Sequence, residues 1–433
     1  MKHLQFLLTL WLTKLISFLI SIFNLGQASN FPGKVVLSFD KNLLTKFKPN
    51  PEIKIILITG TNGKSTTSGL VANILNTAGK KVIYNKSGAN LLSGITSTFC
   101  HYSDLLGNIK CDFIILETDE ATLPVLTKQI KPHLIAVTNF FRDQLDRFGE
   151  LDTTVKLIES GLNYKNNNDK DTIIVLNADD PRAAFLKTGN RKVYYGIRGR
   201  DGEEENNWLS DPEEVTTHHF KIPEINFLIS DFKTDDLTFN FNINYESHKH
   251  NFFLPMIGIF NLYNALCAIS IAKTVLDITP VQIQKGLDAY KTIFGRGEKI
   301  NNNTWIYLIK NPKGATEVLR ALSTNPHARF LMAINDNLAD GRDISWIWDA
   351  RFDILSGHKK EIFVSGKRAY DMALRLKYSN IKPLQIKINE NIKEAINEVS
   401  KTLDQNETLY ILPTYTVLLE MQRKKICKGQ LLD

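Results

Sequence analysis

The sequence predicts an α/β protein: a doubly wound, mostly parallel sheet that carries a β-rich insertion, followed by a smaller Rossmann-like α/β domain. Short β-rich runs alternate with helical stretches between residues 53 and 177, as "IKIILIT", "KVIYN", "DFIILE", "HLIAVT" and "TIIVLN". A glycine-rich turn joins the first run to a helix, and the alternation resumes after Gly297. Sheets of this kind bind ligands beyond the carboxyl ends of their strands.

Changes in local pattern divide the chain into three expected segments. Residues 1–30 hold an apolar, amphipathic helix, residues 31–297 the nucleotide-binding domain, and residues 298–433 a second α/β domain with the runs "TWIYLI", "RFLMAI" and "KEIFVS". Inside the first domain, an acidic, Asn-rich stretch is followed by the alternating run "LTFNFNINY" (Leu237 to Tyr245). This texture predicts an insertion of antiparallel strands at about residues 199–254.

Composition narrows the function classes. A chain of 433 residues with 43% hydrophobic residues buries a sizeable core and is not expected to be disordered. Its net charge of +7 suits an anionic nucleotide, an anionic substrate or a membrane surface, but falls short of a nucleic-acid-binding protein. The four cysteines form no C-x-x-C pair, so we expect reduced thiols and neither a zinc ribbon nor a disulfide framework.

The apolar segment Leu4 to Phe23 has a polar side. Its polar arc contains Gln5, Thr9, Thr13, Lys14, Ser17 and Ser21, opposite Leu8, Trp11, Leu15, Leu19 and Phe23. This pattern favours a helix that lies on a membrane surface or docks on the protein, with a single membrane span as the second interpretation. A signal peptide is the third, and the nucleotide site downstream argues against it because ATP is a cytosolic substrate.

The strongest functional signal is the turn "GTNGKSTTSGL" (Gly60 to Leu70) after the first strand. Backbone N–H groups of such a turn and the helix N-terminus that follows cradle phosphates. Lys64 is expected at the β- and γ-phosphates of ATP and Ser65 at Mg²⁺, while the glycines allow close backbone approach. An ordinary strand-to-helix turn would not require the Gly-Lys-Ser-Thr order. The predicted ATP-binding residues of this turn are Gly60, Thr61, Asn62, Gly63, Lys64, Ser65 and Thr66.

Carboxylates follow the ends of two further predicted strands. Glu117 ends "DFIILE", where a P-loop domain usually holds its magnesium, so Ser65 and Glu117 are the predicted Mg²⁺ ligands. The next residues, Asp119 and Glu120, are either part of this site or solvated loop charges. The segment "FRDQLDRFGE" then brings Asp143, Gln144 and Asp146 near the same edge of the sheet.

Together these motifs resemble the Mur ligases. That family carries the compact "GTNGKST" loop, a strand-end glutamate, a "TN...D-x-L-D" segment and "NADDP", and further similar segments are "GIFNLYNALCA" and "GRGE" (Gly295 to Glu298). The resemblance implies that Asn261 contacts ATP and that Arg296 contacts its γ-phosphate. Many Mur ligases place a magnesium-binding His where Gln144 stands and use a carbamylated Lys, for which Lys156 is the candidate. Because this chain departs from the family at Gln144, the resemblance does not imply a second magnesium site.

The C-terminal third resembles the MurT family, the ligase subunits of lipid II isoglutaminyl synthases. The similar segments are "KNPKGATEVLRAL", "INDNLADGRDISWIWDARF", "SGKRAYDMALRLKY" and "LPTYTVLLEMQRK". The resemblance implies ATP- and Mg²⁺-dependent amidation, through an acyl phosphate, of the D-glutamate α-carboxylate in the lipid II stem peptide. This would make D-isoglutamine for peptidoglycan synthesis, in the cytoplasm at the inner face of the cell membrane.

The same resemblance implies a heterodimer in which a separate GatD-type glutaminase subunit supplies ammonia. It makes Asp349, in "SWIWD", the catalytic carboxylate near the glutaminase contact, where it orients or deprotonates the ammonium. Asp336, Asp340 and Asp343 are expected in a solvated acidic loop. MurT-like proteins commonly carry a four-cysteine zinc ribbon, whereas the insertion here reads "GRDGEEENNW", so structural zinc is not expected.

Two other functions stay open from the sequence. One is a Mur-type or folylpolyglutamate-type ligase that adds an amino acid, against which the segment "DGRDISWIWD" counts. The other is a non-catalytic, ATP-binding regulatory subunit, which an intact set of Lys64, Ser65, Glu117 and Arg296 disfavours. No cysteine lies in a Gly-x-Cys-x-Gly turn, so the ammonia must come from another chain.

Overall fold

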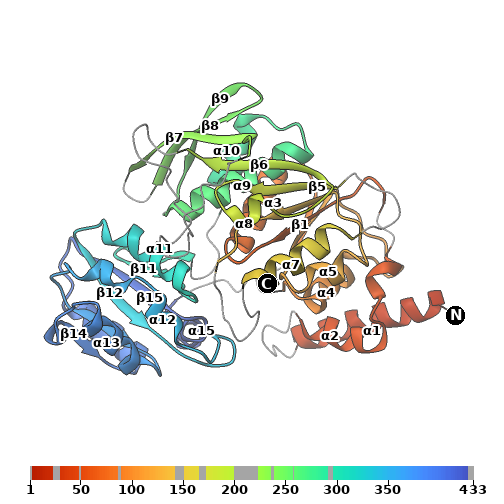
Figure 1. The fold of residues 1–433 in the computed structure, drawn as a ribbon. Coiled ribbons are helices and arrows are strands. Elements are labelled where there is room, and N and C mark those ends of the chain that lie inside the picture. The colour runs from red at the N-terminus through yellow and green to blue at the C-terminus, as the bar shows by residue number, and fades with distance from the viewer. Residues whose placement is uncertain are drawn as a thin grey trace. The chain divides into compact units, whose positions relative to one another are not determined.

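The computed structural model describes residues 2–22, 30–47, 50–85, 89–141, 151–164, 172–198, 223–235, 238–256, 258–290 and 296–427. The chain forms two compact units (Figure 1). The first contains residues 1–140, 151–255 and 260–290, and the second contains residues 141–150, 256–259 and 291–433.

Nine of the described strands form one sheet in the first unit, in the order β2-β3-β1-β4-β5-β6-β7-β8-β9. Their pairing is parallel from β2 to β7 and antiparallel from β7 to β9. The bounds are β1 (Lys54–Thr59), β2 (Val82–Tyr84), β3 (Phe113–Glu117), β4 (Leu134–Val137), β5 (Ile173–Asn177), β6 (Arg191–Ile197), β7 (Phe227–Asp235), β8 (Thr238–Tyr245) and β9 (His248–Leu254). The predicted fold class is confirmed, and the β-rich insertion extends the edge of this sheet.

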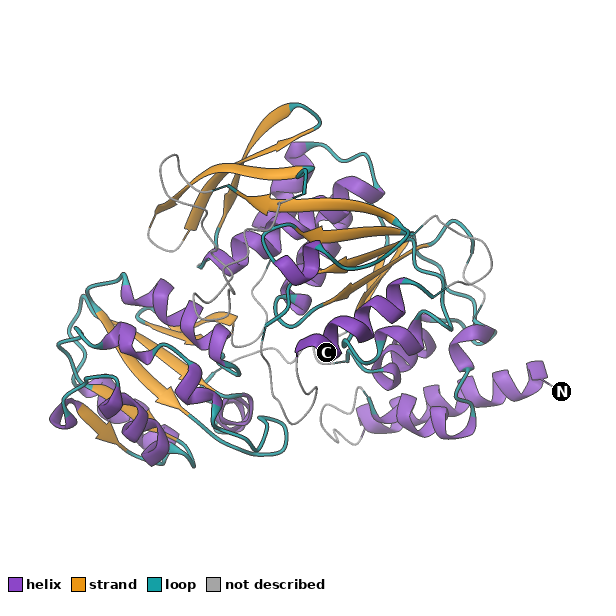
Figure 2. Cartoon of the chain, in the orientation of Figure 1, coloured by secondary structure: helices purple, strands orange, loops and turns teal. Residues whose placement is uncertain are grey.

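Helices cover both faces of the first sheet (Figure 2). Ile55 and Leu57 of β1 join a core with residues of the helices on one face, and Ile56 and Ile58 are fully buried on the other. A parallel strand buried on both faces needs an almost continuous apolar run, which "IKIILIT" supplies. The helices are α1 (Lys2–Ile22), α2 (Phe31–Phe39), η1 (Leu43–Lys46), α3 (Lys64–Thr77), α4 (Leu92–Tyr102), α5 (Leu123–Leu126), α7 (Leu151–Leu162), α8 (Pro181–Ala184), α9 (Ile259–Val275) and α10 (Pro280–Asp288).

The second unit has its own sheet of six described strands, in the order β10-β11-β15-β12-β13-β14. All of its pairs are parallel except β10 with β11. The strands are β10 (Arg296–Asn301), β11 (Thr304–Tyr307), β12 (Ala328–Ala333), β13 (Ile362–Ser365), β14 (Ile386–Ile388) and β15 (Thr408–Pro413). The helices are α11 (Pro312–Ser323), α12 (Trp346–Asp349), η2 (Phe352–Leu355), α13 (Ala369–Tyr378), η3 (Pro383–Gln385), α14 (Ile392–Lys401) and α15 (Tyr415–Arg423).

Helix α1 belongs to the first unit and packs against α2 and α4 (Figure 1). Phe6, Thr9, Leu10 and Thr13 are buried, so the side of the helix that contains two residues of the predicted polar arc faces the protein. Among the helices described here, none is long and apolar enough to cross a membrane.

Candidate active site

The loop between β1 and α3 can hold only glycine at two positions. Gly60 and Gly63 have φ angles of +116° and +86°, which L side chains rarely adopt. A Cβ on Gly63 would collide with the Asn264 side chain, and one on Gly60 would collide with the Thr138 hydroxyl. Both glycines therefore allow backbone to lie directly against neighbouring elements.

The end of β4 fixes the rest of the loop. The Thr61 N–H donates to the Asn139 carbonyl, and the Asn62 N–H donates to the Asn139 side-chain oxygen, both at 2.9 Å. The Thr138 hydroxyl donates to the Asn62 carbonyl at 2.7 Å. The N–H groups of Thr61 and Asn62, both predicted to bind ATP, therefore hold the loop against β4. The N-cap of α3 is Gly63, which has no side chain to occupy the helix N-terminus. The N-terminus of a helix that follows such a loop is where phosphate binds in loops of this kind.

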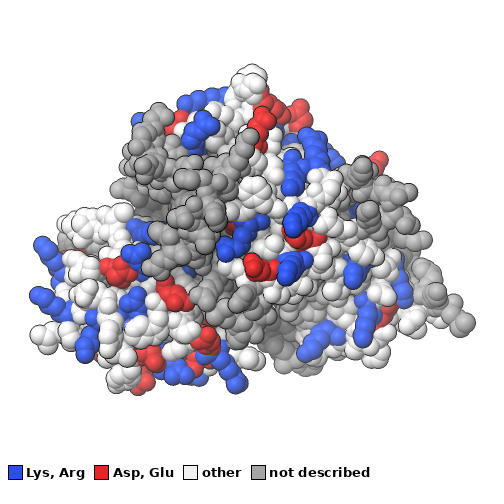
Figure 3. Space-filling model, in the orientation of Figure 1, with Lys and Arg blue, Asp and Glu red and all other residues white. Residues whose placement is uncertain are grey.

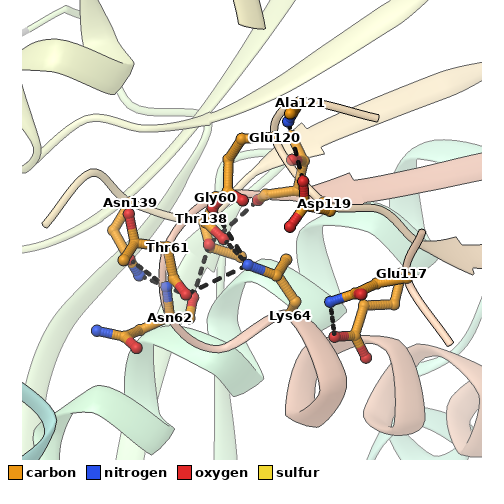
Figure 4. Close-up of polar contacts among 12 residues, drawn as sticks. Gly60, Thr61, Asn62, Lys64, Glu117, Asp119, Glu120, Ala121, Thr138 and Asn139 are labelled. Atoms are coloured by element: carbon orange, nitrogen blue, oxygen red, sulfur yellow. Dashed lines mark hydrogen bonds and ion pairs between the residues drawn. The ribbon is translucent and has the colours of Figure 1, made fainter. Parts of the chain in front are cut away.

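Lys64 lies folded over the loop (Figure 4). Its amine donates to the Gly60 carbonyl at 2.5 Å and to the Thr61 carbonyl at 3.3 Å, and it forms an ion pair with Glu120 at 3.2 Å. Burial raises the pKa of the Glu120 carboxyl, and the Lys64 charge opposes that rise. The interpretation of Asp119 and Glu120 as solvated loop charges is wrong, because only 6% and 4% of their surfaces are exposed.

Glu117 ends β3 in a fixed, buried position. Strand pairing places it beside Ile58, two residues before Gly60. The Asn85 side chain accepts from the Glu117 N–H at 2.7 Å and donates to its carbonyl at 2.8 Å. Asn90 donates to the carboxylate at 3.3 Å. The backbone N–H and carbonyl of Glu117 are therefore both held by Asn85 before any ligand binds.

The donor set suits magnesium. Ser65 and Glu117 offer a hydroxyl and a carboxylate oxygen, the hard ligands that Mg²⁺ prefers, and both residues are buried. Within the described residues no group of three or more His, Cys, Asp or Glu side chains gathers as a metal cage. Mg²⁺ in phosphoryl-transfer sites needs no such cage, because one or two protein ligands are completed by phosphate oxygens and water.

Helix α9 contributes Asn264, which was not among the site residues predicted from the sequence. Asn261, a predicted ATP contact, is buried, and its side-chain oxygen accepts from the Asn264 amide at 3.2 Å. Asn264 is the residue that lies against Gly63. The signals in the sequence were its place three residues after Asn261, on the same helical face, and its position in the Mur ligase-like segment "GIFNLYNALCA".

The "NADDP" segment connects neighbouring strands and helices of the first unit through its two buried aspartates. Asp180 accepts from the Phe140 N–H at 2.6 Å and caps α8. Asp179 accepts from the Ile197 N–H and from the Tyr263 hydroxyl of α9, both at 2.7 Å. Burial raises the pKa of Asp179 to about 6. The two carboxylates thus tie the ends of β4, β5 and β6 to α9.

Several predicted residues are not placed in the site. Asp143, Gln144 and Asp146 lie outside the described residues. Arg296 begins β10 in the second unit, but its side chain also lies outside the description. Lys156 is exposed on α7. Their roles remain predictions.

Asp349 is the exposed last residue of α12 in the second unit. Its neighbouring backbone is held by Arg375, which donates to the Ile347 carbonyl at 2.9 Å and to the Ala350 carbonyl at 2.8 Å. Arg375 lies on α13, is buried and bonds to Ser379. Its guanidinium group therefore holds α12 in a fixed position against α13.

The acidic loop before α12 is more ordered than predicted. Asp340 is buried; it accepts from the Thr416 N–H at 2.7 Å and bonds to the Thr416 hydroxyl. Asp336 is ion-paired with Arg368. The prediction of a solvated loop is wrong for Asp340, while Asp343 is exposed as predicted. This network joins the carboxyl ends of β12, β13 and β15, the edge at which such sheets bind ligands.

Comparisons with known proteins match each of the two units to a family. The family of the Mur ligase middle domain matches residues 58–272, and that of the MurT ligase C-terminal domain matches residues 308–418. The lipid II isoglutaminyl synthase (glutamine-hydrolyzing) subunit MurT of Staphylococcus aureus is 32% identical over 91% of this chain and 92% of its own. The subunit of the same name from Streptococcus pneumoniae is 32% identical over 92% of each chain.

The chain belongs to the MurT family of Mur ligases. The resemblance drawn from the sequence is therefore confirmed. A crystal structure of MurF from Acinetobacter baumannii matches 90% of this chain and 80% of its own with a TM-score of 0.68 and 15% identity. Folylpolyglutamate synthase of Mycobacterium tuberculosis matches 95% and 98% with a TM-score of 0.66 and 13% identity. These two likenesses show the Mur ligase fold alone.

Gly63→Ala is expected to weaken ATP binding by about tenfold or more, because the new methyl group pushes the loop away from Asn264. Gly79→Ala is the matched control, since Gly79 also has a positive φ, +79°, but faces open space. Calorimetric titration with a non-hydrolysable ATP analogue measures both. Equal, small effects of the two substitutions would contradict a close approach at Gly63.

Asp179→Asn is expected to change the pH dependence of stability. The folded pKa of about 6 lies above the ordinary 3.8, so between these values the folded state holds a proton that the unfolded state releases. The free energy of unfolding therefore falls as pH rises through this window, by up to about 3 kcal/mol. Asparagine resembles the protonated acid and removes this fall. Urea unfolding at several pH values tests it, and parallel profiles of variant and wild type would refute it.

Proposed function

We propose that this chain is the ligase subunit of a lipid II isoglutaminyl synthase. It would use ATP to convert the α-carboxylate of D-glutamate in the lipid II stem peptide into the carboxamide of D-isoglutamine. The observation that carries the proposal is the presence, in one MurT-family chain, of an ordered phosphate loop with Lys64 and of Asp349 next to backbone that Arg375 holds. The names of the relatives support the substrate.

The first step is transfer of the γ-phosphoryl group. A carboxylate oxygen of the substrate forms a bond to the γ-phosphorus while the bond from that phosphorus to the β,γ-bridging oxygen breaks, which gives an acyl phosphate and ADP. Lys64 would leave Glu120 for the phosphate oxygens and neutralise their charge, and the N-terminus of α3 would hold them. Mg²⁺, held by Ser65 and Glu117, would supply further neutralisation when bound.

The second step replaces phosphate by nitrogen. Ammonia forms a bond to the acyl carbon, and the bond from that carbon to the phosphate oxygen breaks, so that inorganic phosphate leaves with the electron pair. The nitrogen must lose one proton on the way to the neutral amide. Asp349 would accept this proton or hold the incoming ammonium, and the fork of Arg375 would keep the Asp349 backbone in place.

A partner subunit is supported by the surface beside Asp349. The relatives are each named as a subunit, and the term "glutamine-hydrolyzing" in their names points to a glutaminase of the GatD type. Tyr370, Leu374 and Tyr378 follow one another at four-residue spacing along α13 and are 64%, 46% and 69% exposed. The Trp348 ring, 46% exposed, packs edge-on against Tyr378 at 5.7 Å between ring centroids. Exposed aromatic anchors of this kind are typical of protein interfaces.

Charge and location fit this proposal. On the face drawn in Figure 3, basic and acidic side chains are intermingled over the coloured residues, without the continuous basic surface that nucleic acid requires. ATP is a cytosolic substrate and lipid II is anchored in a bilayer, so we place the enzyme in the cytoplasm at the inner face of the cell membrane.

The alternatives predict different products. An amino-acid-adding ligase shares the fold, but its C-terminal domain would not need the MurT-type segment at residues 308–418. A regulatory subunit would bind ATP without turnover, which gives no reason for a half-buried Lys64 paired with the buried Glu120 near a fixed Glu117.

Lys64→Ala is expected to lower ATP turnover at least about a hundredfold without unfolding the chain, because the main cation of the phosphate site is removed. Lys285→Ala, at an exposed position on α10, is the control and should keep full turnover. Phosphate release measures turnover, and circular dichroism verifies folding. Undiminished turnover in Lys64→Ala would reject the nucleotide site.

Asp349→Asn is expected to keep ATP binding but lose amide formation by about a hundredfold or more, both with a glutaminase partner and with free ammonium. The change keeps the shape of the side chain and removes its charge. Asp343→Asn is the control, since Asp343 is an exposed aspartate in the loop that precedes α12. Mass spectrometry of lipid II across an ammonium series gives the readout. Full recovery at saturating ammonium would limit Asp349 to holding the partner.

A further inference from the structure

Helix α1 turns an unusually apolar face to the outside of the first unit. We call this set of side chains the apolar face of α1. Their exposed fractions run from 37% for Leu12 to 61% for Phe18. At 100° per residue the set covers an arc of about 120° along the whole helix. It consists of Leu4, Leu8, Trp11, Leu12, Leu15, Phe18, Leu19 and Ile22.

The packing of the other side fixes this orientation. Phe6 stacks edge-on with Phe47 at 5.1 Å, and Phe47 does so with Phe99 of α4 at 5.5 Å, so the helix is anchored in the core. Thr9 and Thr13 can be buried because each hydroxyl donates to a carbonyl one turn earlier, at 2.6 and 2.8 Å. The apolar face of α1 therefore cannot turn inward without breaking this core.

The loop after α4 extends the same surface. The Trp11 indole donates to the Leu105 carbonyl at 2.9 Å, and Lys14 donates to the Ser103 carbonyl at 2.7 Å. These bonds hold the loop tip beside the helix, where Leu105 and Leu106 are 64% and 63% exposed. A contiguous apolar surface of this extent marks an interaction site, because isolated soluble proteins seldom leave one open.

The chain segment that carries this surface is rich in lysine. Residues 1–47 contain five lysines and a single acidic residue, Asp40. Asp40 is ion-paired with Lys46 at 2.6 Å. In the adjoining loop the Asp104 carboxylate accepts hydrogen bonds from the Leu106 and Asn108 N–H groups and adds one negative charge. Lys34 and Lys41 are exposed.

We infer that the apolar face of α1, together with Leu105 and Leu106, docks on the surface of an anionic lipid bilayer. Leucine and phenylalanine side chains would enter the boundary between headgroups and acyl chains. The Trp11 ring would lie at the same boundary, which indole rings favour. The lysines would be attracted to anionic headgroups, and each would raise the affinity by about fivefold. A second copy of the chain is the poorer occupant, since it would bring two positive segments together.

Sedimentation of the full-length protein with lipid vesicles tests this inference. Two vesicle types are needed: phosphatidylcholine alone, and phosphatidylcholine mixed with the anionic phosphatidylglycerol. The wild type is expected to bind the mixed vesicles more tightly, and high salt should weaken that binding. Leu8→Gln/Leu15→Gln should reduce binding to the mixed vesicles by about tenfold or more. The control, Val281→Gln/Leu384→Gln, changes apolar residues elsewhere that are even more exposed than Leu8 and Leu15, and should bind as the wild type does.

Three results would overturn the inference. The first is absence of vesicle binding by the wild type, and the second is equal binding by the Leu8/Leu15 variant. The third is a dimer, seen by analytical ultracentrifugation without lipid, that the Leu8/Leu15 substitutions dissociate while vesicle binding is absent. Thermal unfolding of both variants establishes that they are folded. The assay needs neither ATP nor lipid II, so its outcome is independent of the proposed ligase reaction.

Discussion

The close approach of the loop at residues 60–63 to β4 and α9 is the constraint on which the first unit depends. Gly63 must leave room for Asn264, and Gly60 for Thr138, so neither position tolerates a side chain. The same contacts turn the loop carbonyls of Gly60 and Thr61 towards the Lys64 amine. A cation held over the loop, with a buried carboxylate as its resting partner, is preorganised for phosphate because little rearrangement is needed when Glu120 is exchanged for the ligand.

The two units use one architectural rule for different tasks. In each, polar side chains follow the carboxyl ends of parallel strands, which meet at one edge of the sheet. In the first unit that edge carries Glu117 and the phosphate loop. In the second unit that edge carries the network of Asp340 and Thr416. Arg375 holds α12, which ends at Asp349, through hydrogen bonds to two backbone carbonyls. In each unit a carboxylate proposed for the reaction, Glu117 or Asp349, therefore lies on or next to backbone that a neighbouring side chain holds.

Much of this arrangement could be predicted from local sequence. The strand "IKIILIT", the order Gly-Lys-Ser-Thr and the strand-end Glu117 are local patterns, and local patterns are what periodicity and turn chemistry detect. The contact of Asn264 with Gly63 was not predictable in this way, because the two residues are far apart in the chain and only the packing of α9 joins them. Likewise, Glu120 reads as a loop charge until the fold brings Lys64 to it. A helical pattern divides α1 into two faces, but only tertiary packing on Phe47 and Phe99 decides which face is turned inward.

The central claim is that ATP activates a carboxylate of lipid II for attack by ammonia. It is tested most directly with lipid II whose D-glutamate α-carboxylate carries a heavy isotope of oxygen, incubated with the protein, ATP, Mg²⁺ and ammonium as the only nucleophile. An acyl phosphate leaves one carboxylate oxygen on phosphorus when its carbon–oxygen bond breaks. The account therefore predicts heavy oxygen in the released inorganic phosphate, in step with amidated lipid II. Amidated product accompanied by phosphate free of the heavy isotope would contradict it, as would labelled lipid II that stays unchanged while ATP is consumed.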